Sequence, residues 1–362
     1  MSAFGGKADI IQGVAECPLI AKSGHCQDDP PCSLIHLLAT FGSSLKSRLG
    51  NFGREYRRML SIRPVALLVA CLFTLPTWAD GIPMIDAHSQ LPDPNLADDV
   101  IRLMDTAGIH HVILSFRGSA KGNDVIALVR AHPNRITAAI KIKGRHWPQG
   151  SKKFYKNVTK QMASGAFGAI GEALIYHAAK GSKAPEYTVT PEQKQFRYVL
   201  DLARENGWPL IIHIEFRAVP DRQRFMELLE RFLADNRDVA IPLIHLAQLD
   251  PPDVARLIAA HLNVYFMTSH SNTITVRQSK QPWTNMFEGD ELKAGWRNLL
   301  LRHPDRFILN FDNVWPDHWG PDYVQQAALW RKTLATLPPA AAHMIAHENA
   351  ERLWRLAPVG GK

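Results

Sequence analysis

Three histidines and two carboxylates stand out because each lies at the end of a short apolar run. They are His88, Glu172, His213, His245 and Asp312. Any one of them alone is compatible with a hydrogen-bonded core residue or an ordinary loop residue. Together, if buried, they would need charged partners or a metal ion, because desolvated polar groups are costly. Imidazole and carboxylate are ligands that Zn²⁺, Mn²⁺ and Fe²⁺ accept in hydrolytic sites. The set therefore predicts a divalent-metal site.

The elements that must position these residues alternate from residue 82 onward. Runs rich in Val and Ile predict strands near 82–87, 110–116, 135–141, 167–172, 209–214, 241–246, 263–268 and 306–311. Amphipathic segments predict helices at 96–107, 122–131, 192–206, 221–235, 252–260, 291–302 and 322–336. Gly108 and Gly207 predict helix ends. This alternation predicts an α/β fold, a single (β/α)8 TIM barrel of about 250 residues. A doubly wound open sheet is the alternative, although no Gly-x-Gly-x-x-Gly follows the first strand.

In a barrel of this kind the chemistry gathers at the carboxyl ends of the strands. The first predicted strand ends in Asp86-Ala87-His88-Ser89-Gln90. Residues two apart on a strand point to the same side. We therefore expect Asp86, His88 and Gln90 to share a face toward the mouth of the barrel.

The order of these residues resembles the amidohydrolase superfamily, in particular its amidohydrolase-2 branch of metal-dependent hydrolases, lactonases and decarboxylases. The similarity runs from about Ile82 to Leu356. The family's first strand ends in Asp-x-His-x-His, which residues 86–90 resemble. The family's later strands end in an acid or a histidine, to which these residues correspond: Glu172 (an acid also seen in TatD-like relatives), His213, His245 and Asp312. Residues 348–354 resemble the family's closing Asn-Ala-x-Arg-Leu-Phe helix.

The resemblance implies a set of metal ligands: His88, Glu172, His213, His245 and Asp312. Gln90 stands where the family has a second histidine, and a neutral amide oxygen is a weaker ligand than imidazole. One metal ion is therefore expected, zinc in the first place, with manganese or iron as alternatives. The implied reaction is hydrolysis by metal-bound hydroxide, because the metal lowers the pKa of bound water toward about 7. Asp312 would be the general base, and the metal or His245 would polarise the substrate carbonyl.

Charged residues after the predicted strands suggest the kind of substrate. Four of them lie in segments that would reach the mouth: Arg117, Lys143, Arg145 and Arg217. Because such cations pair with carboxylates, we expect an acidic small molecule, such as a carboxylated lactone, ester or amide. Plain surface charge is the alternative. Residues 269–290 could form a lid. Four tryptophans in the same class of loops could form apolar walls: Trp147, Trp283, Trp315 and Trp319.

Two other functions stay open. The same ligands would serve a decarboxylase, a lyase with one metal ion. The missing ligand at Gln90 also fits an exported binding protein that has lost hydrolysis.

The first part of the chain carries the order of a secretory signal. Four arginines between 54 and 63 precede the uncharged run 64–73, and Thr77-Trp78-Ala79 supplies small residues for cleavage. We therefore predict a leader at 1–58 that is over-extended or disordered, a signal peptide at 59–79 and the barrel at 80–362. The protein would be periplasmic or secreted. Leu68-Val69-Ala70-Cys71 also fits a lipobox, so anchoring through Cys71 is a lesser alternative.

Composition excludes several classes of protein. The chain has 362 residues, 46% of them hydrophobic, which excludes a wholly disordered protein. All four cysteines lie at or before residue 71, which excludes disulfides and thiolate sites in the barrel. The net charge of +8 comes without a long basic run, so no nucleic-acid partner is expected. The apolar run 64–73 is too short for a stable membrane span. A homo-oligomer stays open.

Overall fold

The computed structural model describes residues 81–181, 185–279 and 281–359. The predicted leader at 1–58, the signal peptide at 59–79 and Cys71 lie outside the described residues. The predictions of export and of a periplasmic or secreted location therefore stay predictions.

Parallel strands appear at all eight predicted places, and the fourth is divided in two. They are β1 Met84–Leu91, β2 Ile109–Phe116, β3 Ile136–Ile140, β4 Phe167–Ile170, β5 Ala173–His177, β7 Ile212–Ile214, β8 Ile241–Leu243, β9 Val264–Met267 and β12 Phe307–Ile308. Three short strands are additional: β6 Tyr187–Thr188, β10 Phe287–Glu288 and β11 Glu291–Leu292. β6 pairs antiparallel with β5, and β10 with β11. The remaining pairs of neighbouring strands are parallel.

Strand pairing does not close the predicted barrel into one sheet. The described strands form a sheet in the order β1-β2-β3-β4 and a second in the order β12-β9-β8-β7-β5-β6. The two sheets have two breaks between them, which we call seams. The first seam lies between β4 and β5, at Gly171 and Glu172, where Gly171 N donates a hydrogen bond to Ile140 O at 2.9 Å. The second seam lies between β1 and the segment after β12. Single backbone hydrogen bonds connect them in place of a ladder: Ala87 N donates to Leu309 O at 3.1 Å, and Asp312 N donates to His88 O at 2.9 Å.

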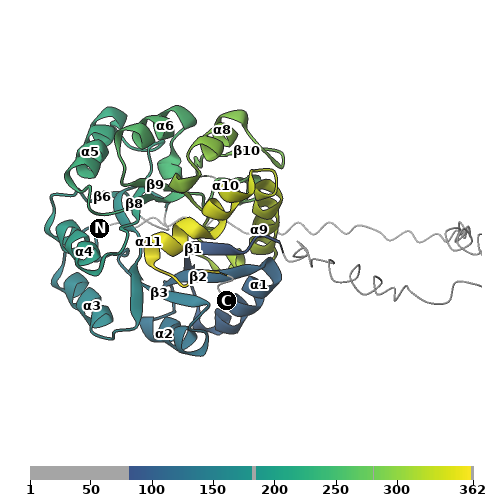
Figure 1. The fold of residues 1–362 in the computed structure, drawn as a ribbon. Helices are drawn as coiled ribbons and strands as arrows, with labels where there is room; N and C mark the ends of the chain where they lie inside the picture. The colour runs from purple at the N-terminus through teal and green to yellow at the C-terminus, as the bar shows by residue number, and fades with distance from the viewer. Residues whose placement is uncertain (1–80, 182–184, 280, 360–362) are drawn as a thin grey trace, which may run out of the picture. The chain divides into compact units, whose positions relative to one another are not determined.

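Helices surround the strands, as Figure 1 shows. They are α1 Ala97–Ala107, α2 Gly122–Ala131, α3 Lys152–Met162, α4 Lys194–Asn206, α5 Arg222–Asp235, α6 Pro251–Ala260, α7 Thr273–Gln278, α8 Ala294–Arg302, α9 Pro321–Leu334, α10 Pro339–His343 and α11 Asn349–Trp354. The seven predicted helices are confirmed within a few residues. Gly108 and Gly207 follow α1 and α4 with φ of 63° and 61°, a left-handed conformation that glycine adopts without strain.

Two apolar cores hold the fold together. The larger one lies between the strands and the helices, and the smaller one fills the inside of the ring of strands with residues such as Ile85, Ile113 and Ile308. Ala350 and Trp354 of α11 belong to the inner core. In Figure 1, α11 lies across the ring. This helix therefore covers one end of the barrel, and the polar residues lie at the carboxyl ends of the strands.

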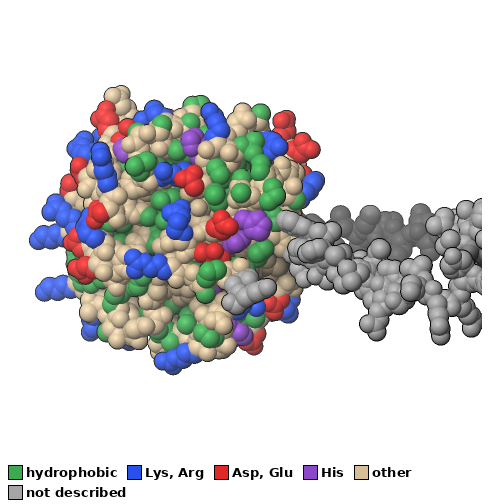
Figure 2. Space-filling model, in the orientation of Figure 1, with side chains coloured by type: hydrophobic (Ala, Val, Ile, Leu, Met, Phe, Trp, Pro, Cys, Tyr) green, Lys and Arg blue, Asp and Glu red, His purple; other side chains and the backbone are tan. Residues whose placement is uncertain are grey.

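The surface mixes both signs of charge. In the view of Figure 2, Lys and Arg side chains alternate with Asp and Glu side chains, and they form no continuous basic stripe on that face. Within the described part of the chain, no helix has the length and apolar character needed to cross a membrane.

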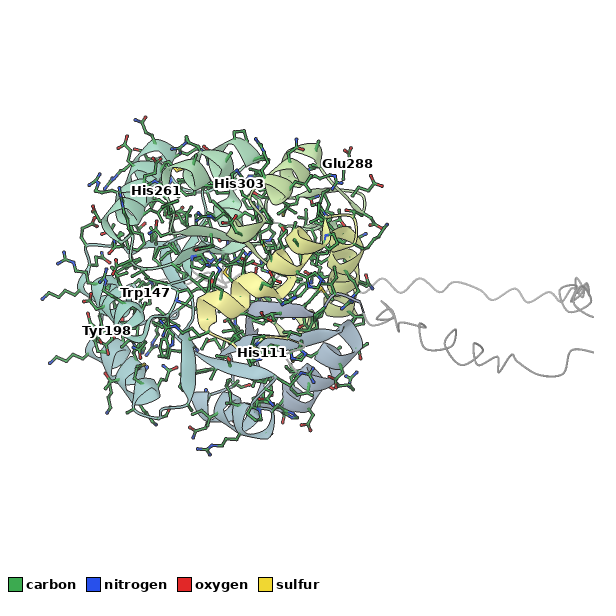
Figure 3. All side chains as sticks on the ribbon, viewed as in Figure 1. His111, Trp147, Tyr198, His261, Glu288 and His303 are labelled. Carbon is green, nitrogen blue, oxygen red and sulfur yellow. The ribbon has the colours of Figure 1, made fainter. Side chains whose placement is uncertain are left out.

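His111, labelled in Figure 3, is a buried histidine that ties β2 to the start of β3. Its Nδ1 lies 3.1 Å from Asn134 O, so it donates there, and its Nε2 lies 2.8 Å from Thr137 Oγ1. Burial lowers the pKa of His111 to about 4. Both ring nitrogens are therefore engaged in the neutral form.

The acid dependence of stability should report this histidine. Between pH 6.5 and 4 the unfolded chain binds a proton at His111 that the folded chain does not, so the free energy of unfolding falls with falling pH. Urea unfolding of wild type and of His111→Gln should be measured between pH 6.5 and 4. Over this range the free energy of unfolding should fall by about 3 kcal/mol less in the variant than in wild type. The exposed neighbour supplies the control, since His110→Gln should keep most of the wild-type pH dependence. Identical pH profiles for wild type and His111→Gln would contradict the assignment.

Candidate metal centre

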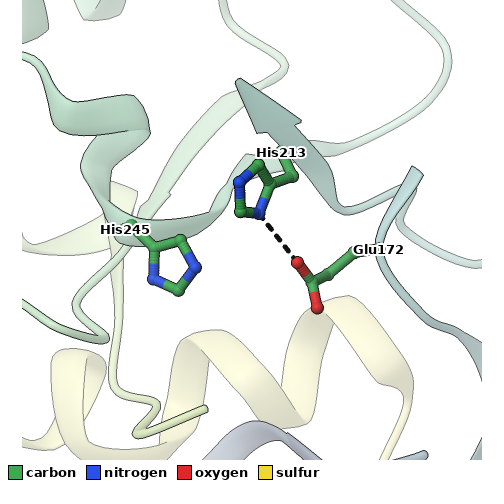
Figure 4. A group of neighbouring side chains, drawn as sticks. All are labelled: Glu172, His213 and His245. Carbon is green, nitrogen blue, oxygen red and sulfur yellow. Dashed lines mark hydrogen bonds and ion pairs between the residues drawn. The ribbon is translucent and has the colours of Figure 1, made fainter. Parts of the chain in front are cut away.

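The structure brings the five predicted ligands together at the carboxyl ends of the strands. His88 lies on β1, Glu172 between β4 and β5, and His213 on β7, while His245 follows β8 and Asp312 follows β12. None of the five is more than 5% exposed. Figure 4 shows Glu172, His213 and His245 pointing into the same space. The predicted face of β1 is confirmed for His88 and Gln90. Asp86 instead accepts a hydrogen bond from Phe311 N at 3.0 Å and ties β1 to the segment after β12.

The ligand atoms form three overlapping groups, in each of which they lie within 4.8 Å of one another. The groups are His88, Glu172 and Asp312; Glu172, His213 and His245; and His245, His270 and Asp312. Each group shares at least one residue with the next, so the three make one continuous cluster. Three protein ligands within such a distance are what a catalytic zinc site requires.

His270 is the member that sequence reasoning missed. Its ring stacks on His245 with centroids 4.6 Å apart, and its buried Nδ1 has no hydrogen-bond partner. It lies three residues beyond β9, in the segment predicted to be a lid. The only available signal was a histidine close behind the seventh predicted strand.

Three cluster residues adopt a left-handed backbone conformation. The φ angles of His245, His270 and Asp312 are 56°, 52° and 52°. Each costs about 1–2 kcal/mol for a residue other than glycine. Strain of this kind persists where the surrounding structure enforces it, and it gathers at functional sites. Here it turns three side chains at strand ends into the same cluster.

Glu172 is the carboxylate on which most contacts converge. Its Oε1 contacts Lys143 Nζ and lies 3.2 Å from His88 Nε2, and its Oε2 lies 2.9 Å from His213 Nδ1. Burial alone would raise the pKa of Glu172, but Lys143, His213 and His88 lower it well below its usual range. Glu172 is therefore a buried anion.

Gln90 links the two carboxylates of the cluster. Its Nε2 donates to Glu172 Oε1 and to Asp312 Oδ1, both at 3.2 Å. Ionised carboxylates only accept, so the amide nitrogen has to face them. The side chain thus lies inside the cluster as a donor, and its role as a ligand stays a prediction.

His213 lies between two carboxylates. Glu215 Oε1 is 3.2 Å from its Nε2, on the side opposite Glu172. Burial would lower the pKa of His213, but Glu172 and Glu215 raise it to about 9. Burial would likewise raise the pKa of Glu215, whereas His213 and Lys180 lower it to about 2. Glu215, two residues beyond His213 on the same face, escaped the sequence analysis because one more acid in a strand-end loop has no distinctive pattern.

His245 is neutral, and one of its ring nitrogens is available as a metal ligand. Ser269 Oγ lies 2.8 Å from its Nδ1, which leaves Nε2 facing Asp312 Oδ2 at 3.5 Å. Burial and then His270 lower the pKa of His245 well below its usual range. A neutral imidazole with one nitrogen fixed by a partner is the form that binds a metal.

Comparison with known families decides the assignment. The profile described as TatD related DNase matches residues 85–288, which is more than half of the chain. The chain belongs to the TatD related DNase family. This confirms the resemblance to metal-dependent TIM-barrel hydrolases of the amidohydrolase superfamily, because the family shares that fold.

Solved structures agree on the fold. An uncharacterized TIM-barrel protein from Bordetella bronchiseptica is 17% identical, with a TM-score of 0.50 over 76% of this chain and 99% of that chain. The 4-oxalomesaconate hydratase from Rhodopseudomonas palustris is 12% identical, with a TM-score of 0.52 over 75% of this chain and 95% of that chain. A probable 2-pyrone-4,6-dicarboxylic acid hydrolase from Acinetobacter baumannii is 10% identical, with a TM-score of 0.48 over 75% of this chain and 99% of that chain. No curated protein matches the chain.

The donor set of this TatD-related protein fits a divalent cation. Neutral His245 Nε2, the unpartnered Nδ1 of His270 and the Asp312 carboxylate are ligands of the borderline type that zinc, manganese and iron accept. Glu172 and His213 extend the set. The residues fit a metal ion, and the identity of the metal stays a prediction.

The four predicted substrate-binding cations have different surroundings. Lys143 lies in the cluster on Glu172. Arg117 lies with its guanidinium 3.8 Å from the centre of the Trp315 ring. Arg217 is paired with Asp250 at 2.7 Å. Arg145 lines a separate cavity.

The tryptophans predicted to form apolar walls also lie in different surroundings. Trp283 lies 4.7 Å from His245 between ring centroids and so covers the cluster. Arg217 donates to Trp283 O at 3.2 Å, which connects that cation to the covering segment. Trp319 donates from Nε1 to Gln90 O at 3.0 Å. Trp147 is fully buried and donates to Leu174 O, so it is a core residue and no wall of the mouth.

Removing Lys143 tests whether this cation balances the buried negative charge of Glu172. Lys143→Met should lower the free energy of unfolding by about 2 kcal/mol in chelator, less than for a fully buried pair because 25% of the Lys143 side chain is exposed. Added zinc should raise the melting temperature of this variant more than that of wild type. Lys141→Met, in the same loop and without a contact to Glu172, is the matched control. Equal losses in both variants would show that Lys143 does not balance Glu172.

Proposed function

We propose that the protein is a metal-dependent hydrolase of a small carboxylate-bearing lactone, ester or amide. One divalent ion would serve it, zinc in the first place and manganese or iron otherwise. The observation that carries the proposal is the buried cluster of His88, Glu172, His213, His245 and Asp312. Its ligand atoms fall into overlapping groups of three, and the atoms of each group lie within 4.8 Å of one another. Family membership supports a metal-dependent hydrolase in general, and the substrate is our inference.

The chain's own residues have distinct parts in this reaction. When bound, the ion would lower the pKa of water at the site and polarise the substrate carbonyl. Asp312 lies 3.5 Å from His245 and 3.7 Å from His88, inside the cluster, which supports a role for its carboxylate in accepting the water proton and passing it to the leaving group. Gln90 orients that carboxylate by donating to Oδ1. Trp283 would limit the access of water to the site.

The acidic nature of the substrate rests on Arg117. Burial lowers the pKa of its guanidinium, and its charge interacts with Asp312 and Glu172, so it lies close to the cluster. Because Arg217 already has Asp250 and Lys143 already has Glu172, Arg117 is the cation best placed to receive a substrate carboxylate. Export to the periplasm or out of the cell remains part of the proposal and depends on residues 59–79.

The comparisons favour two alternatives. One neighbour with the same fold is by name a hydratase, which keeps a lyase, including a decarboxylase, as an alternative. The family description favours hydrolysis of a DNA phosphodiester as a second candidate, since the same ligands could serve phosphoryl chemistry. The mixed charge in Figure 2 supplies no stripe for a DNA backbone on that face. A binding protein without turnover is the remaining alternative suggested by Gln90.

Metal content tests the centre directly. We expect elemental analysis of the purified full chain to find one zinc, manganese or iron ion per chain that is lost in His245→Gln. His343, His347 and Glu348 form a separate group of donor atoms, so the count should be repeated in His347→Gln, which should keep the ion. Metal that persists unchanged in His245→Gln would place it elsewhere. No metal after reconstitution would favour the binding protein.

Turnover tests the reaction. Carboxylated lactones, esters and amides should be screened beside single-stranded DNA and beside carboxylates that could release CO₂. Asp312→Asn should lower turnover of the best substrate by about a hundredfold to ten-thousandfold, because it removes the general base. Metal content and melting temperature control for loss of the centre or of the fold. Unchanged turnover in Asp312→Asn would refute the role of Asp312, and turnover of DNA alone would favour the phosphodiesterase.

A further inference from the structure

A cavity outside the metal centre is lined mostly by residues of α2, of α3 and of the segment after β3. It has a volume of about 630 Å³. Five of its lining residues carry positive charge: Lys121, Lys141, Lys143, Arg145 and Lys160. The described residues that line it include no Asp or Glu. Its volume is in the range of about 300–1,000 Å³ that holds small-molecule ligands.

Four of the five cations of this cavity have no ion pair with a described residue. In the described part of the chain, the ion pairs include one of these side chains, Lys143, which contacts Glu172. Lys121, Lys141, Arg145 and Lys160 have no ion pair there. Burial lowers the pKa of Lys141, and the nearby charges of Arg117, Lys121 and Lys143 lower it further. Uncompensated like charges around a concavity attract an anion, since a low-dielectric wall focuses their field.

The cavity also offers an apolar surface. Phe116, Phe154 and Phe167 line it, and Phe154 and Phe167 are nearly buried at 2% and 8% exposure. Lys141 Nζ lies 5.3 Å from the centre of the Phe116 ring, so cation and apolar surface adjoin. A ligand that contacted both the cations and the phenylalanine rings would need an apolar body as well as negative charge. The partly exposed Phe116 supplies that apolar surface, whereas Phe154 and Phe167 are too buried to offer a row of rings on which successive nucleic-acid bases stack.

We propose that this cavity binds a small organic anion with an apolar ring and at least two negatively charged groups. The site is distinct from the metal centre, because Lys143 is the one cation of its lining that is paired with Glu172 and no other residue of the metal cluster lines it. The proposal assigns Arg145, which was predicted to bind the substrate at the mouth, to the ligand of this cavity instead. Binding does not require the metal, so the proposal stands or falls separately from the proposed hydrolase.

A fluorescent probe tests the site. Naphthalene-1,4-dicarboxylate is titrated into the chelator-treated full chain, and saturable binding of one probe per chain is expected. Lys160→Glu should weaken binding by about tenfold or more, since a charge-assisted contact becomes repulsion. Lys156→Glu is the matched control: this exposed lysine lies on α3 and does not line the cavity, so the probe's affinity should stay within about twofold of wild type. Arg145→Glu gives a second, independent loss.

Two further ligands separate charge from apolar contact. Neutral naphthalenemethanol and malonate, which has no ring, should each bind at least about tenfold more weakly than the probe. The proposal is overturned if the probe does not saturate, if Lys156→Glu weakens it as much as Lys160→Glu, or if malonate binds equally well. Displacement of the probe by a short single-stranded oligodeoxynucleotide would overturn it in favour of a nucleic-acid site.

Discussion

Glu172 is a carboxylate without solvent contact, and burying such a charge costs several kcal/mol unless cations and donors surround it. The structure supplies them from separate strands: His88 from β1, His213 from β7 and Lys143 from the segment after β3. None of these residues is near Glu172 in sequence. The carboxylate is satisfied only when the strands meet in the right order, so the fold and the site depend on the same contacts.

The two seams of the strand arrangement coincide with the two carboxylates of the cluster. Glu172 lies where β4 gives way to β5, and Asp312 lies where the ladder beyond β12 becomes single hydrogen bonds. A residue within a regular ladder holds its side chain perpendicular to the sheet. Interrupting the ladder frees the backbone to turn a short acid toward the axis, and the left-handed conformation of Asp312 does so. Incomplete strand pairing thus accompanies the two carboxylates of the cluster, while His88 and His213 lie on paired strands.

Much of this arrangement could be predicted from sequence, and the rest depends on contacts that spacing does not encode. Strand positions followed from apolar runs, and the five candidate ligands, which the structure brings together, followed from polar residues at the ends of those runs and from the family resemblance. His270 was missed because it lies three residues beyond β9, inside the segment predicted to be a lid, and not at the end of the strand itself. The break between the two sheets could not be predicted either, since Gly171 and Glu172 read as the end of the fourth strand and the strand that follows them, β5, was not predicted. Export and location lie in a part of the chain that the structure does not describe.

The cations show most clearly why residue type alone does not determine a role. Arg117, Lys143, Arg145 and Arg217 occupy equivalent places in the sequence, each shortly after a predicted strand, and each has a different electrostatic environment. Arg217 and Lys143 have carboxylate partners, so a ligand would have to displace Asp250 or Glu172 to use them. Arg117 and Arg145 have no such partner among the described residues, and they face different spaces. The proposed anion at the mouth and the proposed anion in the cavity would therefore be recognised by different side chains. The charge that looked like one substrate site in sequence divides into two in space.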